Sequence, residues 1–259
     1  KSELYHLITC PFIFYEQQRN LLNLHMSLIK IFEDEYFIGV HKPNNMLVHH
    51  AYHSRNISDE TSLLQLILKK TGLKVYPIHR LDRKTSGIIL LAKKTQYVST
   101  FQKLFTHHEI QKIYYGVVRG FSPETKIIDS PVKGRDASVH KAALTYLKTI
   151  SKITLEIPVE PYDSSRYSLV ELSPKTGRMH QLRVHSNKIS HPLIGDIKYG
   201  DKNHNQMFDK QFGWKHMFLH AGKLEFIHPF TSEKLLLKAA FPKDWISLFE
   251  KFAWENPLI

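Results

Sequence analysis

Short runs of β-forming residues, separated by tight turns, recur along this chain and restrict the folds open to it. Residues 28–32 and 36–41 flank an acidic turn as the strands of a hairpin would, and residues 218–227 and 234–240 repeat this arrangement. The other runs predicted as strands are residues 46–49, 75–81, 87–92, 112–118, 127–132, 142–149, 154–157 and 168–172. Because strands outnumber helices and most connections are short, the sequence predicts an α+β fold with a mixed, mainly antiparallel sheet.

Helices are expected to flank this sheet. Residues 58–70 form the first, with Ser58 as its N-terminal cap and Gly72 at its end. Residues 95–107 form the second, and we interpret its aromatic stripe as core packing. The remaining predicted helices are residues 176–188, beginning at Thr176, and residues 244–252, capped by Asp244.

The charge balance indicates the kind of partner. The chain has 36 Lys and Arg residues against 24 Asp and Glu, a net charge of +12, which favours a polyanion such as nucleic acid or an anionic membrane surface. No run of about 18 apolar residues occurs, so we expect no membrane insertion. A single cysteine, Cys10, excludes an internal disulfide framework and a multi-cysteine zinc site, and it fits a cytoplasmic protein.

Several common catalytic motifs are absent from the sequence. It contains no GxGxxG or GxxxxGK[ST] phosphate loop, no HExxH zinc motif and no GxSxG nucleophile turn. The adjacent pairs His49-His50 and His107-His108 diverge in direction on a strand or a helix, so neither is a natural chelate. We therefore expect no metal site, and no recognisable helix-turn-helix or zinc finger indicates a DNA-binding protein.

The chain is expected to form one domain after a short extension. Residues 1–25 contain an apolar patch but neither a basic leader region nor a clear cleavage site, so we do not interpret them as a secretory signal. From Met26 onward the pattern is regular, and no linker-like change in composition follows. We expect a single domain over residues 26–259, with residues 1–25 as an N-terminal extension of unknown role.

One acidic residue, Asp82, lies between two arginines in the sequence HRLDR, residues 79–83. In an extended backbone residues two apart share a face, so Arg80 and Asp82 would project together, opposite Arg83. A carboxylate beside a guanidinium stays ionised at neutral pH, and their attraction is of order 4 kcal/mol at about 4 Å and an effective dielectric of about 20. An ionised, partly dehydrated carboxylate is a nucleophile, although such a pentapeptide alone is more often a structural or solvated ion pair.

A second concentration of polar residues spans residues 175–185, with the sequence KTGRMHQLRVH. On a regular helix Arg178 and Arg183 would be about 140° apart and would serve different partners. One could hold a phosphate while the other holds the Asp82 carboxylate. Two independent surface arginines would fit the same spacing.

Four blocks of the sequence stand out together. They are residues 79–87, HRLDRKTSG; residues 111–115, QKIYY; residues 176–185, TGRMHQLRVH; and residues 191–200, HPLIGDIKYG. In this order they resemble the signature blocks of the RluA-type pseudouridine synthases, and the resemblance covers roughly residues 28 to 250. It departs from the commonest pattern at Ser190, where the family often has Gly. The resemblance implies the α+β catalytic fold of that family, with a central active-site cleft in residues 26–259.

The resemblance also implies an activity, the isomerisation of uridine in RNA to pseudouridine, without a metal or cofactor. It implies that Asp82 is the catalytic aspartate, that Arg183 pairs with it, and that Tyr114 stacks on the target uracil. Such an enzyme must flip the uridine out of its stack, at a cost of a few kcal/mol. Whether Asp82 attacks the ribose, attacks the base or abstracts a proton stays open, as does removal of the C5 proton by Tyr114.

Basic residues near these blocks are predicted to bind the RNA. Arg80 is similar to the family's arginine that enters the RNA helix and takes the place of the flipped base. The other residues that we predict to contact RNA are Arg83, Lys112, Arg178 and His180.

A weaker resemblance concerns the RNA itself. Residues 162–167, 169–174 and 200–221 resemble segments of the tRNA pseudouridine-65 synthases, which modify a uridine at the T-stem. This predicts tRNA as the partner and uridine 65 as the target of a cytoplasmic monomer. The alternatives are ribosomal RNA, another tRNA site or, less favoured because Asp82 is present, a non-catalytic RNA-binding relative.

Overall fold

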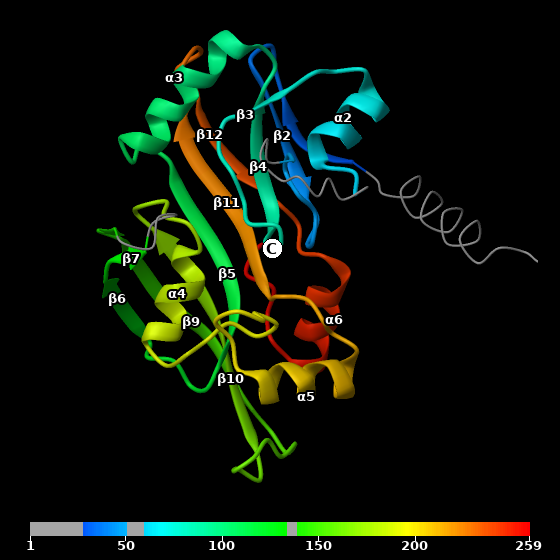
Figure 1. The fold of residues 1–259 in the computed structure, drawn as a ribbon, viewed down its shortest axis with the longest axis vertical. Helices are drawn as coiled ribbons and strands as arrows, with labels where there is room; N and C mark the ends of the chain where they lie inside the picture. Colours follow the sequence, from blue (N-terminus) through cyan, green and yellow to red (C-terminus); the bar gives the residue numbers. More distant parts are fainter. Residues whose placement is uncertain (1–27, 51–59, 134–138) are drawn as a thin grey trace, which may run out of the picture.

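The computed structural model describes residues 28–50, 60–133 and 139–259 of the chain (Figure 1). The predicted extension, residues 1–25, lies outside the described residues, as does Ser58. Among the helices of the described part, none is long and apolar enough to cross a membrane.

The strands form one large sheet and one small hairpin. They are β1 (Ile29–Glu33), β2 (Phe37–Lys42), β3 (Tyr76–Pro77), β4 (Ser86–Ala92), β5 (Gln111–Arg119), β6 (Thr125–Asp129), β7 (Val132–Lys133), β8 (His140–Lys141), β9 (Leu144–Leu155), β10 (Ser165–Pro174), β11 (Leu219–Ile227) and β12 (Lys234–Lys238). Within the described residues the main path of the sheet is β1-β2-β4-β11-β5-β10-β9-β6, with β3 on β4 and β12 on β11. All these pairings are antiparallel except the parallel pairing of β4 with β11, so the predicted mixed, mainly antiparallel sheet is confirmed.

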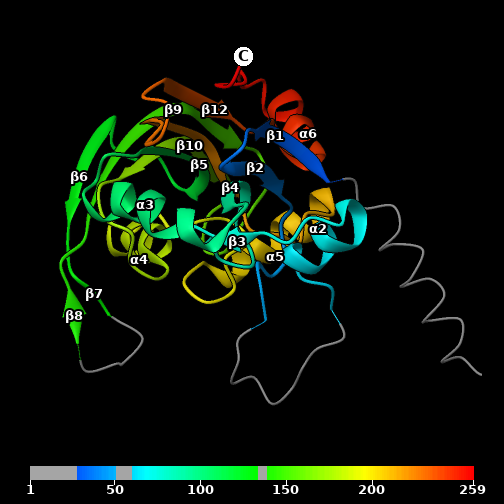
Figure 2. The ribbon, with the colours of Figure 1, turned by 90° about the horizontal axis from the view of Figure 1, so that it is seen from above.

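The helices flank this sheet, as predicted. They are α2 (Leu63–Thr71), α3 (Thr95–Thr106), α4 (Gln181–Lys188), α5 (Lys202–Phe212) and α6 (Lys243–Phe252). Seen from above, α3 and α4 lie on the inner side of the curved sheet (Figure 2).

The sheet divides at β11, and a helix packs across the division. The parallel pairing of β4 with β11 is limited to two residue pairs, after which β11 pairs with β12 instead. Tyr97, Phe101 and Leu104 of α3 join a buried cluster with residues of β4, β11 and β12. The aromatic stripe predicted for this helix is therefore core packing.

Two further clusters meet at Tyr114 of β5. One contains Leu66 of α2 with residues of β2 and β4, and the other contains Leu182 of α4 with residues of β10. Tyr114 packs against both, so it lies where the two halves of the fold adjoin. The predicted central cleft is found at this junction.

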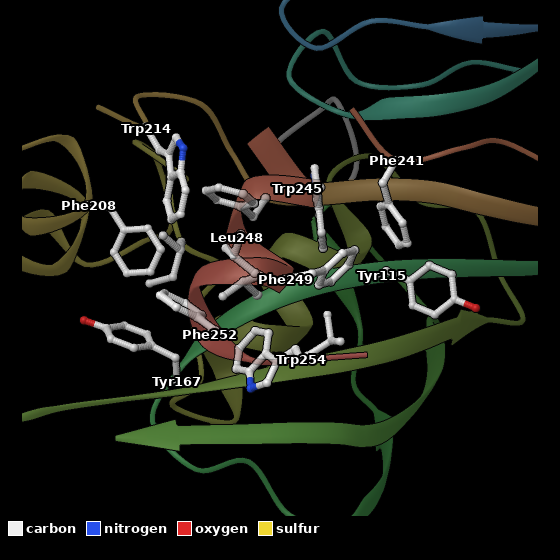
Figure 3. Packing of buried hydrophobic residues seen from close by; sticks show 14 of the residues in the cluster. Tyr115, Tyr167, Phe208, Trp214, Phe241, Trp245, Leu248, Phe249, Phe252 and Trp254 are labelled. Carbon is white, nitrogen blue, oxygen red and sulfur yellow. The ribbon is translucent and has the colours of Figure 1, made fainter. Parts of the chain in front are cut away.

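An aromatic core packs on the face of the sheet opposite Tyr114 (Figure 3). Phe208 of α5 belongs to one buried cluster with Trp245, Phe249 and Phe252 of α6 and with Tyr115 of β5. Burial of each such side chain contributes roughly 2–3 kcal/mol. This core therefore holds β5 in place, and Tyr115 of the core is the next residue after Tyr114.

Some predicted boundaries were wrong. Residues 46–49 form no strand, and of residues 75–81 only Tyr76–Pro77 pairs with β4. The two strands predicted over residues 142–149 and 154–157 are one continuous strand, β9. A register shift between Leu169 and Val170 of its neighbour lets the long pair bend without breaking.

The helix ends also differ from the predictions. Helix α2 is capped by Ser62, in a capping box with Gln65, and ends at Gly72 as expected. The predicted helix over residues 176–188 begins only at Gln181, and α6 is preceded by Pro242 as its cap, with Asp244 inside its first turn. The prediction did not include α5. At Ser190, φ is +64°, a left-handed conformation that glycine would adopt without strain.

Candidate active site

Asp82 lies in the loop that joins β3 to β4, and buried neighbours hold this loop in place. Leu81 is buried, and His79 Nε2 accepts a hydrogen bond from the Leu90 backbone amide at 2.9 Å. Burial lowers the pKa of His79 to about 3, so its ring stays neutral and can accept this bond. Arg80 and Asp82 line the same cavity, but so do His79 and Leu81, so the alternation of an extended strand that we predicted for this segment is not found.

A buried lysine fastens the other side of the loop. Lys42 at the end of β2 is fully buried, and its Nζ donates to the carbonyl oxygens of Pro43, Met46 and Arg83 at 2.8, 3.0 and 3.0 Å. Burial lowers the pKa of Lys42 to about 7, although the charge of Asp82 opposes this change. The bond to Arg83 fixes the backbone next to the Asp82 carboxylate.

A glycine permits the strands to meet beneath the loop. Gly87 has φ +110°, and a Cβ atom there would lie 2.2 Å from the carbonyl oxygen of Ala221 in β11. Only glycine tolerates both the conformation and the close approach. The glycine that ends the HRLDRKTSG block therefore lets β4 lie against β11 directly after the Asp82 loop.

The Asp82 carboxylate faces a guanidinium from α4. Arg183 Nη1 lies 3.3 Å from Asp82 Oδ2, so the predicted pair exists. The closer partner of Arg183 is Asp196, whose Oδ2 and Oδ1 accept hydrogen bonds from Nε and Nη2 at 2.7 and 2.8 Å. Burial tends to raise the pKa of Asp196, but the hydrogen bonds from Arg183 and from the amides of Lys198 and Tyr199 outweigh this and lower it.

His180 is a second group near Asp82. Its Nε2 lies 3.8 Å from Asp82 Oδ2, and its Nδ1 lies 3.2 Å from the Tyr199 hydroxyl. Burial lowers the pKa of His180, so the ring is neutral at neutral pH despite the nearby charge of Asp82. The Tyr199 ring also lies 5.2 Å from the guanidinium carbon of Arg183. Tyr199 therefore contacts both groups that face Asp82.

A cavity of about 650 Å³ opens beside the carboxylate. Asp82, Arg80, Tyr114 and Arg183 lie in its wall, and its size is within the range of small-ligand sites. Burial, reinforced by the charge of Asp82, raises the pKa of Tyr114, so the phenol keeps its proton at neutral pH. A carboxylate, a guanidinium and an aromatic ring thus surround one space.

The residues predicted to bind RNA are only partly brought together here. Those that line the cavity are Arg80, Lys112, Arg178 and His180. Lys112 is only 8% exposed, and its Nζ donates to the carbonyl oxygen of Thr176 at 3.4 Å. Burial, with a contribution from Lys175, lowers the pKa of Lys112 to about 8.

Arg178 and Arg83 are each held by a contact with another segment of the chain. Arg178 lies before α4, not on it, and its Nε donates to the carbonyl oxygen of Ala142 at 3.0 Å. The helical phase used to separate Arg178 from Arg183 therefore does not apply. Arg83 pairs with Glu60 at 2.8 Å and does not line the cavity.

Three residues of the site escaped the sequence reasoning, namely Lys42, Asp196 and Tyr199. Asp196 and Tyr199 belong to the block HPLIGDIKYG, so that block was the available signal. Its acid and its tyrosine had no assigned role because nothing local indicates that they meet Arg183. Lys42 gave no signal beyond its position at the end of a predicted strand.

Within residues 28–50, 60–133 and 139–259, no three His, Cys, Asp or Glu side chains are grouped as a metal site would require. The expectation that neither a metal nor a cofactor is needed stays a prediction.

Comparison with known proteins defines the class of protein. Residues 36–188 match the family described as RNA pseudouridylate synthase. This chain belongs to the RNA pseudouridylate synthase family, of the RluA type, and is an isomerase that acts on RNA. The fold and enzyme class predicted from the sequence blocks are confirmed.

Among individual proteins, the chain is similar to the tRNA pseudouridine synthase C of Vibrio parahaemolyticus, with 36% identity over 88% of this chain and 96% of the relative. The tRNA pseudouridine synthase C of Haemophilus ducreyi is also 36% identical, over 88% and 97%. Human RNA pseudouridylate synthase domain containing 4 shares the fold, with a TM-score of 0.70, 24% identity and coverage of 93% and 99%. Human RNA pseudouridylate synthase domain containing 1 does so with a TM-score of 0.66, 22% identity and coverage of 83% and 84%.

Proposed function

We propose that this enzyme converts a uridine of tRNA to pseudouridine and that Asp82 is its catalytic carboxylate. The tRNA substrate is supported by relatives named tRNA pseudouridine synthase C that align over 88% of the chain. Uridine 65 is the target that we propose, from the resemblance of residues 162–174 and 200–221. The observation that carries the catalytic assignment is the Asp82 carboxylate, held 3.3 Å from Arg183 at the wall of the cavity.

The first step in this proposal is entry of the base. Arg80 is exposed at the cavity, and within the described part of the chain its side chain has no hydrogen-bond or ion-pair partner, so it is available to fill the gap in the RNA stack. The flipped uracil then stacks on Tyr114, which offsets part of the unstacking cost. Lys112, Arg178 and His180 contact the RNA around this base, and Arg83, paired with Glu60, supports the loop.

The chemistry follows from the carboxylate at the floor. Asp82 starts the reaction, and the N1–C1′ glycosidic bond breaks. The detached uracil turns within the cavity, and C5 bonds to C1′ of the same ribose. The C5 proton is then lost and N1 regains a proton, so atoms and charges balance. Arg183 keeps the Asp82 carboxylate oriented throughout, because Asp196 holds the guanidinium by two other hydrogen bonds.

Tyr114 is proposed to stack rather than to act as the base for the C5 proton. A general base works best when its pKa lies near the working pH. Burial and the charge of Asp82 move the pKa of Tyr114 upward, away from that range. Stacking needs only the ring face, which a protonated phenol provides equally well.

We also propose that the enzyme acts as a cytoplasmic monomer. The side chains proposed for catalysis and stacking, Asp82, Arg183 and Tyr114, line one cavity of this chain. The tRNA substrate is present in the cytoplasm. A sedimentation measurement with and without tRNA would test the monomeric state.

The decisive experiment is to incubate the purified protein with tRNA transcripts and to map pseudouridine by mass spectrometry. We expect modification at uridine 65, and a turnover at least about 1,000-fold lower for Asp82→Asn with RNA affinity within about tenfold of wild type. Asp209→Asn, which alters an exposed aspartate that pairs with Lys215, is the matched control and should behave as wild type. Substantial turnover by Asp82→Asn would show that Asp82 is not the catalytic carboxylate. Modification of another uridine would show that uridine 65 is not the target.

A further inference from the structure

The Asp82 cavity continues into a second hollow outside the catalytic site. This second hollow, also about 650 Å³, shares His108, Lys112 and Pro174 with the cavity. A third, of about 540 Å³, shares Tyr146 and Ser173 with the second. The second and third hollows therefore adjoin each other, from the start of β5 and the end of β10 to the face of β9 and β6. We name these two hollows the outer groove.

The outer groove is lined by cations that acids of the groove do not neutralise. Lys112 and Lys175 lie side by side at its beginning, and Lys175 contributes to the lowered pKa of Lys112. Lys126 is exposed at its far end. Within the described residues no acidic side chain forms an ion pair with any of these three lysines.

The lysines that line the two hollows outnumber the acids, with five (Lys112, Lys126, Lys148, Lys175 and Lys234) against three (Glu109, Glu171 and Glu225). Glu225 lies 2.5 Å from Lys234, and Glu109 lies 3.6 Å from His107. Glu171 is directly opposite Lys148 in the pairing of β10 with β9. Positive charge is therefore left over along the groove, as a phosphate-binding surface requires.

An exposed aromatic ring lies among these lysines. Tyr146 of β9 is 38% exposed although it lies in a strand of the main sheet, and Lys175 Nζ is 5.8 Å from its ring centre. Its partner across the strands, Ile127, is 61% exposed. Aromatic rings interleaved with lysines are the combination by which proteins hold the bases and backbone of an RNA strand.

We propose that the outer groove binds the RNA strand that flanks the flipped uridine, with its phosphates on Lys112, Lys175 and Lys126 and a nucleoside on Tyr146. This inference rests on the proposed function of the Asp82 cavity, because the groove begins at that cavity's wall. It assigns to the face of β9 and β6 a binding role separate from catalysis. RNA that reaches beyond the cavity gains affinity there, and shorter RNA does not.

The test compares two substrates, full-length tRNA and a short stem-loop that carries only the base pairs next to the target uridine. For Lys175→Glu we expect kcat/KM on tRNA to fall roughly tenfold, mostly through KM, with a loss on the stem-loop at least about fivefold smaller. The slope of log Kd against log salt for tRNA should decrease by about one. Tyr146→Ala should also lower kcat/KM more on tRNA than on the stem-loop, but it should leave the slope of log Kd against log salt unchanged.

Lys251→Glu is the matched control because it makes the same charge reversal away from the groove. Lys251 of α6 lies 5.3 Å from the ring centre of Phe212, the last residue of α5. It should leave both substrates unaffected, and circular dichroism should report native folding for all three variants. Equal losses of kcat/KM on both RNAs, or equal kcat/KM values for Lys175→Glu and Lys251→Glu, would overturn the proposal that the outer groove binds RNA. If the wild-type enzyme modifies neither RNA, the proposed tRNA function fails instead, so the two failures are distinguishable.

Discussion

Arg183 is a single guanidinium placed between two carboxylates. It gives two short hydrogen bonds to Asp196 and one longer contact, 3.3 Å, to Asp82. A fork of rigid N–H donors suits this division, because the bidentate bond fixes the plane of the guanidinium and leaves Nη1 directed at the second carboxylate. Asp196 therefore determines where Arg183 can hold Asp82.

We expect Asp196→Asn to lower the free energy of unfolding by about 3 kcal/mol, because it leaves a buried guanidinium with an incomplete partner. The folded pKa of Asp196 lies below its ordinary value of 3.8, so its contribution is fully present above that value and is lost as the pH falls through the folded pKa. Chemical denaturation of both proteins at pH 7 and below pH 3.8 measures this. A difference that does not shrink in acid would contradict the ion-pair explanation.

The role of Tyr114 can be separated by two substitutions. Tyr114→Phe keeps the ring and should retain turnover within about tenfold, whereas Tyr114→Ala should lose about 1–3 kcal/mol of RNA binding. Single-turnover kinetics with saturating tRNA, together with Kd, distinguishes chemistry from binding. A Phe variant that binds normally but is as slow as the Ala variant would assign the C5 proton to the phenol.

Among the elements, the turn before Asp196 places the tightest demand on one residue. Gly195 has φ +78°, and a Cβ atom there would lie 1.9 Å from the carbonyl oxygen of His216. Its amide donates to Asn205 Oδ1 at 2.7 Å, which ties the turn to α5. This turn delivers Asp196 to Arg183.

Gly195→Ala should therefore destabilise the protein by more than the roughly 1–2 kcal/mol of a left-handed alanine, and it should also reduce turnover. Gly213→Ala is the matched control, since Gly213 has φ +74° with no atom within 4 Å of an added Cβ. Thermal unfolding and turnover of the two variants isolate the steric clash. Equal effects of the two substitutions would show that the close approach has no cost.

The elements that could be predicted are those with local signals. The two hairpins and α3 were anticipated because apolar spacing and turn residues specify them over short stretches. The start of α4 was misplaced because His180 adopts φ +56°, which a preceding glycine and polar run do not reveal. Helix α5 was missed because it is mostly polar and buries only His204, Met207 and Phe208, although its cap Asp201 and terminal Gly213 were visible signals.

At the scale of the whole molecule, the site was predictable as a set of residues but not as a geometry. Asp82 and Arg183 are separated by 101 positions, and only the folding of the sheet brings the Asp82 loop and α4 together. Family resemblance could nominate that pair, and the structure places the two side chains in contact. The anchors Lys42 and Asp196 act through contacts across the fold, which no local pattern reports.

The trio of two carboxylates and one guanidinium has a consequence for which part of a nucleotide can enter. Its net charge is minus one, at the bottom of a hollow in a protein of net charge +12. We expect the exposed Arg80 and Arg178 to attract phosphate, while the negative trio, in which the Asp82 side chain is only 18% exposed, favours a neutral uracil ring over a phosphate. The charges of the cavity therefore favour entry of the neutral base and binding of the anionic backbone at its exposed edge. The same charges disfavour free nucleotides as competitors.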